Sequence, residues 1–455
     1  MFFYKSELTA MKKNKSKVLK IIIKYVFLFL IFLVFTLILS PVNIDEIWNY
    51  GFSYNIYKGL IPYKDFNMVL TPLYPMIMAV FLHSFGKGIL SIHIVNAIIL
   101  CFSSHLLFKM YGKKAYLIII LFFLPFYLTF PSYNTFLVVL TIILIFLEKE
   151  KKDNKNIDYL IGVVLGLLIL TKQTVGFCVL IGSMIYAGNK NKIGKRVAGC
   201  LIPILVFTTY LIATNSYSQF FDLCFLGLLD FSKNSQGFNV YTIITIILLL
   251  INIYLIVKEK DKLAYYSLFF SSITIPICDL AHLSPYLVII SNFIIPKIKK
   301  DLIDYKALFV SSVLIASVLV FSDNYDGTKT IYPNDLNNFN YRYISKTHYD
   351  LTKKILNWMD GKKEQIIFLD ANAYYFKLIR DEKIGYIDLI NQGNWGYHGS
   401  EKLLKTLSKY KNTYFIINKE DYKSHNQIDK NALEYIFKNG EKKEEINCYE
   451  IYYIK

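Results

Sequence analysis

Long apolar runs fill most of residues 1–321 and restrict what this chain can fold into. Three of them, residues 21–40, 197–213 and 240–257, reach or approach the length of about 17–25 apolar residues that crosses a bilayer. Charged residues make up only 19% of the 455-residue sequence, whereas a soluble domain carries roughly 25%. The sequence therefore predicts a polytopic α-helical membrane protein in contact with membrane lipids.

The basic residues determine the predicted topology. The net charge of +17 comes almost entirely from residues 1–321, because residues 322–455 contain 21 basic and 19 acidic side chains. Residues 71–85 are short for a span and contain Pro72 and Pro75, so we expect this segment to lie at the outer surface. Every Lys-rich short loop then falls on the cytoplasmic side, as the positive-inside rule requires. This predicts about eleven spans, with the N-terminus inside and the C-terminus outside, at residues 21–40, 89–108, 115–131, 134–147, 159–171, 175–188, 197–214, 239–257, 263–279, 283–296 and 305–321.

Residues 322–455 have a different pattern. Strand-like segments at 365–369, 413–418 and 449–454 alternate with helix-like segments at 348–359, 400–410 and 430–438. Such alternation is typical of an α/β domain with a partly parallel sheet. The predicted organisation is thus a transmembrane domain over residues 1–321, with its first outer loop at 41–88, and an extracytoplasmic α/β domain over residues 322–455.

Cysteine and histidine placement excludes some classes of site. The six cysteines are scattered, with no Cys-x-x-Cys and no Cys/His ligand spacing, so neither a disulfide framework nor a zinc site is indicated. His83, His93 and His105 lie on apolar stretches and are expected to be buried or interfacial rather than ligands. The basic residues do not form one face of a folded module, which argues against a nucleic-acid partner.

Acidic residues mark the predicted first outer loop. Asp45 and Glu46 follow the first span, and an acid at a membrane boundary is a candidate functional residue. The alternative is a charged pair that only ends the first helix. Asp65 is a candidate for substrate binding, although a local ion pair with Lys64 competes with that role.

Aromatic residues are frequent in the same loop. Tyr50 and Tyr63 belong to this set, and such side chains commonly anchor a protein at the headgroup level. Apolar and polar positions alternate at helical spacing over residues 47–57 and again over 73–85. Both segments are predicted to be helices that lie in the interface plane.

Cationic candidates occur in two other predicted outer loops. Lys172 and His282 could stabilise negative charge on a bound phosphate. Lys172 could instead be a snorkelling lysine, and His282 a satisfied polar residue at a helix start. Asp279 could orient His282 from three residues away, or cap the helix that follows.

Three ordered motifs on the predicted outer face carry a family resemblance. Asp45-Glu46-x-x-x-Tyr50, Gly59-x-x-Pro-Tyr63-x-Asp65-Phe and Thr71-Pro-Leu-Tyr-Pro75 resemble the first outer loop of GT-C membrane glycosyltransferases. The group concerned is the protein-mannosyltransferase-like family with its bacterial relatives. Leu170-Thr-Lys-Gln-Thr-Val-Gly176 is similar to a second signature, and Asp279-Leu-Ala-His282 with Pro285 to a third, so the resemblance covers residues 20–320.

The resemblance implies an inverting hexosyl- or pentosyltransferase. Its donor would be a sugar on a polyprenyl phosphate, and its acceptor a cell-envelope glycan, teichoic acid, glycolipid or protein outside the membrane. Asp45 would be the base, and Glu46 would hold the acceptor or tune Asp45. Substrate binding would fall to Asp65, Tyr50, Tyr63, Lys172, Asp279 and His282.

Two features leave alternatives open. Some relatives use a divalent metal with paired first-loop acids, and this sequence does not decide metal dependence. Residues 275–278 are apolar where a basic residue is expected, so donor-phosphate binding depends more on Lys172.

The rival function is a transporter or flippase of lipid-linked sugars. Transporters favour internal repeats and charged sites at the bilayer midplane, whereas here the ionisable residues gather at one outer face and no repeat is visible. A non-catalytic envelope scaffold would leave Asp45, Lys172 and His282 unexplained. The composition, rich in Lys, Ile and Asn, suggests the plasma membrane of a low-GC bacterium.

Overall fold

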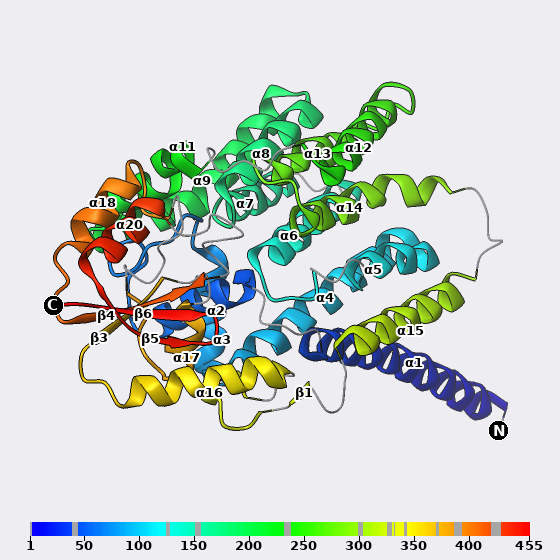
Figure 1. The fold of residues 1–455 in the computed structure, drawn as a ribbon. Helices are drawn as coiled ribbons and strands as arrows, with labels where there is room; N and C mark the ends of the chain where they lie inside the picture. The colour runs from blue at the N-terminus through cyan, green and yellow to red at the C-terminus, as the bar shows by residue number, and fades with distance from the viewer. Residues whose placement is uncertain are drawn as a thin grey trace.

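A small β-sheet with its own helices covers one end of an elongated helical body (Figure 1). The N-terminus lies at the opposite end of that body, beyond α1 (Figure 1). The computed structural model describes residues 2–38, 44–123, 128–150, 156–231, 238–298, 304–324, 330–331, 333–340, 344–369, 373–385, 394–419 and 429–455.

The helical body agrees with the predicted class of membrane protein. Four of its described segments are long and apolar enough to cross a membrane, at Val18–Leu37, Ile89–Phe123, Lys190–Ala213 and Val240–Val257. Large apolar side chains such as Leu205 and Val206 stay exposed on these helices, as a lipid-facing surface requires. Within the described residues the body contains α1 (Phe2–Ile38), α4 (Ile89–Tyr111), α5 (Ala115–Phe123), α6 (Tyr133–Lys149), α7 (Ile157–Ile169), α8 (Gln173–Ala187), α9 (Lys190–Ala213), α12 (Val240–Val257), α13 (Ala264–Phe270), α14 (Leu280–Ile294) and α15 (Tyr305–Asn324).

Two predicted spans differ from the observed helices. The span predicted at 115–131 is represented by α5, which ends at Phe123, and residues 124–127 lie outside the described ones. The span predicted at 263–279 is wrong in its second half. There α13 passes into a 3₁₀ turn at Ser271–Thr274 and the helix stops, because Pro276 disfavours helical backbone at the residue before it.

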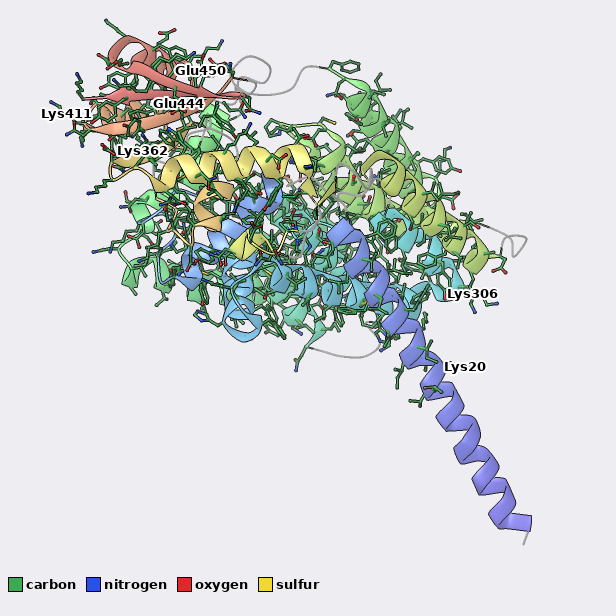
Figure 2. All side chains as sticks on the ribbon, turned by 60° about the horizontal axis from the view of Figure 1, so that its bottom comes forward. Lys20, Lys306, Lys362, Lys411, Glu444 and Glu450 are labelled. Carbon is green, nitrogen blue, oxygen red and sulfur yellow. The ribbon has the colours of Figure 1, made fainter. Side chains whose placement is uncertain are left out.

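The Lys-rich loops lie together at one end of the body. Lys114 donates hydrogen bonds from Nζ to the carbonyl oxygens of Pro296 (2.9 Å) and Ile298 (2.8 Å). Lys297 in turn lies 3.2 Å from a carboxylate oxygen of Glu259, which joins a third basic loop to the same end. Figure 2 places Lys20 and Lys306 toward this end, and Lys362, Lys411, Glu444 and Glu450 at the other. These contacts bring together three of the predicted basic loops, those at Lys114, Glu259 and Lys297.

The first outer loop forms the two predicted helices, α2 (Ile44–Tyr57) and α3 (Leu73–Phe85), which pack against each other. Several of their aromatic side chains are buried in the protein, whereas Phe85 at the end of α3 is exposed. Tyr50, Tyr54 and Tyr74 are at most 1% exposed, because they share one hydrophobic cluster with residues 336–384 of the C-terminal region. The α2–α3 pair is thus sandwiched between the helical body and the sheet-containing region.

The C-terminal region has the predicted α/β architecture. Its sheet has the order β3-β4-β6-β5, with β3 (Gln365–Leu369) parallel to β4 (Thr413–Asn418) and β6 (Tyr449–Ile454) antiparallel to β4. Helices α18 (Gly399–Leu407) and α20 (Lys430–Asn439) pack on one face. Helices α16 (Lys346–Asp360) and α17 (Ala373–Ile379) pack on the other, which also faces α2.

Three strands of the described structure were not predicted. The edge strand β5 (Glu441–Ile446) has the sequence Glu-Lys-Lys-Glu-Glu-Ile, in which five of the six residues are charged and only Ile446 is of a type that favours strands. It forms because a turn with Asn447 at φ +53° folds it back along β6. Its charged side chains protect an exposed sheet edge from pairing with other chains. Short β1 (Thr330–Ile331) and β2 (Ile344–Ser345) pair separately, antiparallel to each other.

The C-terminal region contacts the first outer loop through hydrogen bonds as well as through apolar packing. Asn55 of α2 donates to the carbonyl oxygen of Ile384 (2.9 Å) and accepts from its N–H (3.1 Å). Lys87, at the end of the loop, donates to the Asp381 carboxylate (2.7 Å). The predicted division at residue 321 therefore does not separate two independently packed cores, since α2 and α3 belong to both.

Helices α7 and α9 approach each other closely because glycines line their contact. A side-chain carbon added at Gly162 would collide with the Arg196 carbonyl, and one added at Gly199 with the Tyr159 carbonyl. Gly162 and Gly166 form the small-xxx-small spacing that lets membrane helices bring their backbones together.

We expect Gly199→Leu to destabilise the protein by about 1–3 kcal/mol, the usual effect of overpacking. Gly194→Leu is the matched control, since Gly194 lies on the same helix with nothing within 4 Å of an added side chain. Thermal unfolding in detergent, followed by tryptophan fluorescence, should show a lower midpoint for Gly199→Leu alone. Equal midpoints for the two variants would contradict the close α7–α9 contact.

Candidate active site

The N-terminal ends of four helices, α2, α6, α8 and α14, meet at the end of the body that faces the sheet. The side chains at these ends act on one another electrostatically: Asp45, Tyr133, Lys172, Asp279 and His282. They come from four segments that are far apart in the sequence. A helix N-terminus carries about half a unit of positive charge, so this meeting point favours negative charge.

Asp279 and His282 form a hydrogen-bonded pair at the start of α14. An Asp279 carboxylate oxygen accepts the His282 backbone N–H (2.9 Å) and lies 2.7 Å from His282 Nδ1. Capping and orientation, considered as alternatives from the sequence, thus occur together. Because Nδ1 is bound to Asp279, Nε2 is the ring nitrogen available to other partners. The Asp279 side chain keeps 33% of its surface accessible, and the His282 side chain keeps 13%.

The pair also sets the charge of Asp279. Burial raises the pKa of this carboxyl, but hydrogen bonds from His282 and the charges of His282 and Lys172 outweigh burial and hold its pKa below the usual value. Asp279 is therefore a carboxylate at neutral pH.

Lys172 occupies the N-cap of α8, an unusual place for a cation. Its side chain makes no capping hydrogen bond, whereas good N-cap residues accept one. The ammonium lies 5.3 Å from the centroid of the Tyr133 ring, within range of a cation–π contact. Burial lowers the pKa of Lys172 to about 8, although Asp45 and Asp279 act in the opposite direction. The predicted role of Lys172 in phosphate binding stays a prediction.

Asp45 is the second residue of α2 and lies within electrostatic range of this cation. Burial raises the pKa of the Asp45 carboxyl, and Asp279 raises it further, while His282 and Lys172 lower it. Asp45 and Lys172 are surrounded by protein atoms, yet each keeps part of its surface accessible.

Glu46 has a different environment from Asp45. Its Oε1 lies 2.6 Å from His93 Nε2 on α4, and the two side chains are 1% and 0% exposed. Consecutive helical residues point about 100° apart, so two adjacent acids on α2 face different neighbours. The structure thus places Glu46 in a buried pair with His93, and the predicted acceptor-holding role for Glu46 stays a prediction. His93 is buried, as the sequence indicated.

Asp65, Tyr50 and Tyr63 serve the fold of the first outer loop. Asp65 accepts the Ile61 N–H (2.7 Å) with its carboxylate and closes a turn. The Tyr50 hydroxyl donates to the Lys87 carbonyl (2.6 Å), and the Tyr63 hydroxyl to the Leu70 carbonyl (2.7 Å). A local ion pair between Lys64 and Asp65 was the alternative considered from the sequence. In the structure Lys64 donates to the Thr214 carbonyl (3.3 Å). Their predicted substrate contacts stay predictions.

Two further residues lie near the site. Tyr133 provides the ring beside Lys172, while Ser132 caps α6 by accepting the Thr135 N–H (3.4 Å). Gln173 donates to the Cys224 carbonyl (2.8 Å) and to the Val69 carbonyl (3.2 Å). Its hydrogen bonds fix the Lys172 loop between two other outer loops. The polar run 171–174 was the available signal for Gln173.

A metal site has no candidate ligand set in the described part of the chain. No group of three or more His, Cys, Asp or Glu side chains is placed there to hold a metal ion. The dependence on a divalent metal that the resemblance leaves open therefore receives no residue assignment.

Comparison with solved structures identifies the class of fold. ArnT from Cupriavidus metallidurans bound to undecaprenyl phosphate matches with a TM-score of 0.58 at 11% sequence identity, over 95% of this chain and 97% of that one. The apo state of the same protein also gives 0.58, at 10% identity over 96% and 98% of the two chains. This chain therefore has the overall fold of ArnT along nearly its whole length.

More distant comparisons add no argument. The Archaeoglobus fulgidus oligosaccharyltransferase complex with Zn and sulfate matches with a TM-score of 0.40 at 11% identity, over 87% of this chain and 68% of that one. No family model and no curated protein matches the sequence.

The charge balance at Lys172 can be measured directly. After reductive ¹³C-methylation, the Lys172 resonance should titrate with a midpoint near 8, because burial disfavours the ammonium. Asp45→Asn removes a carboxylate that raises this pKa, so the midpoint should fall, by on the order of one pH unit. A Lys172→Arg sample assigns the resonance. A midpoint that stays in place or rises in Asp45→Asn would show that the two groups are not neighbours.

Proposed function

We propose that this chain is a membrane glycosyltransferase that moves a sugar from a polyprenyl phosphate to an acceptor hydroxyl outside the membrane. The observation that carries the proposal is the enclosed pair of Lys172 and Asp45 among four helix N-termini. The fold supports it, because ArnT, which matches over nearly its whole length, has been solved bound to undecaprenyl phosphate.

The cationic side of the site suits a donor phosphate. A lysine at a helix N-cap adds positive charge where the helix is already positive, which is unfavourable unless an anion is near. Helix N-termini bind phosphate through their free N–H groups, and the first turn of α8 has no side-chain cap from Lys172. When the His282 ring is protonated, Nε2 is a second donor for a phosphate oxygen while Nδ1–H stays on Asp279.

The acidic side suits an acceptor hydroxyl. Asp45 takes the hydroxyl proton as that oxygen forms its bond to the anomeric carbon of the sugar. At the same time the bond from this carbon to the phosphate oxygen breaks, and the lipid phosphate leaves with an additional negative charge. Lys172 and His282 stabilise this charge. A raised pKa makes Asp45 a stronger base than an ordinary carboxylate. A single displacement of this kind inverts the anomeric configuration.

The location of the site favours transfer over transport. The cluster lies at the end of the body that faces the C-terminal sheet, and the basic loops gather at the other end. A flippase needs a site near the midplane that both sides can reach. With the basic loops in the cytoplasm, the reaction takes place at the outer face of the plasma membrane. The envelope glycan, teichoic acid, glycolipid or protein acceptor, the hexose or pentose donor, and the low-GC bacterial origin are proposed from the sequence.

Purified protein in liposomes with a polyprenyl-phosphate sugar should lose activity differently in two variants. Asp45→Asn should lower turnover by on the order of 10²–10⁴-fold, the usual contribution of a general base. The donor KM should change little, because the phosphate side of the site is intact. Lys172→Ala should raise the donor KM and also lower turnover, because the lost charge acts on both bound donor and leaving phosphate.

Lys362→Ala is the matched control, since Lys362 also lies over an aromatic ring, 5.0 Å from that of Trp358, but far from the site in the C-terminal region. It should keep wild-type activity. Wild-type turnover in Asp45→Asn would remove Asp45 as the base. Full activity in both site variants would reject the glycosyltransferase proposal and favour a transporter.

A further inference from the structure

A second carboxylate–histidine pair lies beside the candidate site but is closed off from it. Glu46 on α2 and His93 on α4 are 2.6 Å apart, and His93 Nδ1 lies 2.5 Å from the hydroxyl of Thr36 on α1. All three side chains are at most 1% exposed. The chain Glu46–His93–Thr36 therefore joins three helices through buried polar contacts.

The Glu46–His93 pair lies at the start of α2, and the anchoring of this first turn determines where Asp45 lies. Farther along the helix, Asn55 is hydrogen-bonded to Ile384, and Gly51 packs directly on the Tyr374 ring. Those contacts hold the second half of α2 to the C-terminal region. Asp45 lies in the first turn, and first turns fray unless they are tied to their surroundings. Glu46, the next residue, provides a tie to the helical body.

We propose that the Glu46–His93 pair is a positioning device, which sets the rotation of the first turn of α2 so that Asp45 faces Lys172. With Glu46 fixed on α4, the angle of about 100° between consecutive residues directs Asp45 to a different side of the helix. That side is where Lys172, Asp279 and His282 gather. The consequence of this positioning for turnover rests on the proposed function, but the positioning itself does not.

A buried ion pair often adds little to the stability of the folded protein, so a positioning role explains the Glu46–His93 pair better than stabilisation does. Burying two charged groups costs free energy that their attraction often only offsets, and apolar replacements of both are frequently neutral. What such replacements lose is the single geometry that the pair enforces. The Glu46→Leu/His93→Leu double variant therefore tests positioning without leaving an unpaired buried charge.

The chain offers a matched control on the same two helices. The Tyr25 hydroxyl of α1 lies 2.8 Å from His105 Nδ1 of α4. This is a second polar contact between α1 and α4, and it does not involve α2. His105→Leu removes a histidine contact between these helices without touching α2. A general loosening of α1 against α4 would affect this variant as well.

The first readout does not depend on any enzymatic activity. If the pair positions Asp45, the Lys172 titration midpoint in Glu46→Leu/His93→Leu should fall as it does in Asp45→Asn, by on the order of one pH unit. His105→Leu should keep the wild-type midpoint. A wild-type midpoint in the double variant would overturn the proposal, whatever the protein catalyses. If the double variant does not fold, the single variants Glu46→Gln and His93→Gln are used instead. Both retain a hydrogen-bonding group, and their turnover is measured.

The second readout is turnover in liposomes. The double variant should lose turnover toward the level of Asp45→Asn at an unchanged donor KM, and adding Asp45→Asn to it should cause little further loss. Glu46→Gln, which keeps a hydrogen-bonding partner for His93, should stay within a few-fold of wild type, and so should His93→Gln. A loss in Glu46→Gln as large as in Asp45→Asn would show that the Glu46 carboxylate itself takes part in the chemistry, and would overturn the positioning role.

Discussion

The placement of a lysine at the positive end of a helix is the interaction on which the site depends. Lys172 sits at the N-cap of α8, where a neutral or acidic acceptor is the stable choice. Asp45 and Asp279 balance part of this charge, and the lowered pKa of Lys172 shows that they do not compensate fully for burial. A phosphate bound here, as we propose for the donor, would add negative charge that favours the ammonium form of Lys172.

The rest of the fold can be understood as support for this arrangement. Glycines bring α7 and α9 together and thereby fix the helix that leads to Lys172. Gln173 ties the same loop to the Val69 and Cys224 carbonyls. On the acidic side, α2 is held at one end by His93 and at the other by the C-terminal region. The outer α/β region is in this view a structural part of the site, because it shares a core with the helix that carries Asp45.

The sequence predicted those features that arise from local pattern. Apolar runs and Lys-rich loops predicted the membrane class, and the strands at 365–369, 413–418 and 449–454 appear at the predicted residues. Polar residues in predicted outer loops predicted which side chains would meet, since Asp45, Lys172, Asp279 and His282 do lie together. The pattern was informative because each of these residues interrupts an otherwise apolar stretch.

Features that depend on distant contacts were not predictable in this way. Tyr50 and Tyr63 are residues of the type that anchors a protein at the membrane interface, but distant parts of the chain bury them. Tyr50 packs on Phe339 of the C-terminal region, and Tyr63 packs on Phe220. Glu46 and Asp45 are indistinguishable in the sequence, and only the rotation of α2 against α4 separates their environments. Strand β5 has no strand propensity of its own and forms through pairing with β6.

The central claim is that the enclosed lysine holds the phosphate of a lipid carrier. Binding of undecaprenyl phosphate to the purified protein, measured by native mass spectrometry in titration, tests it without an assumption about sugar or acceptor. Replacing Lys172 by methionine should weaken binding on the order of 10- to 100-fold, the worth of a charged hydrogen bond, while Asp45→Asn should bind at least as well as wild type. Equal affinity of wild type and Lys172→Met would contradict the account.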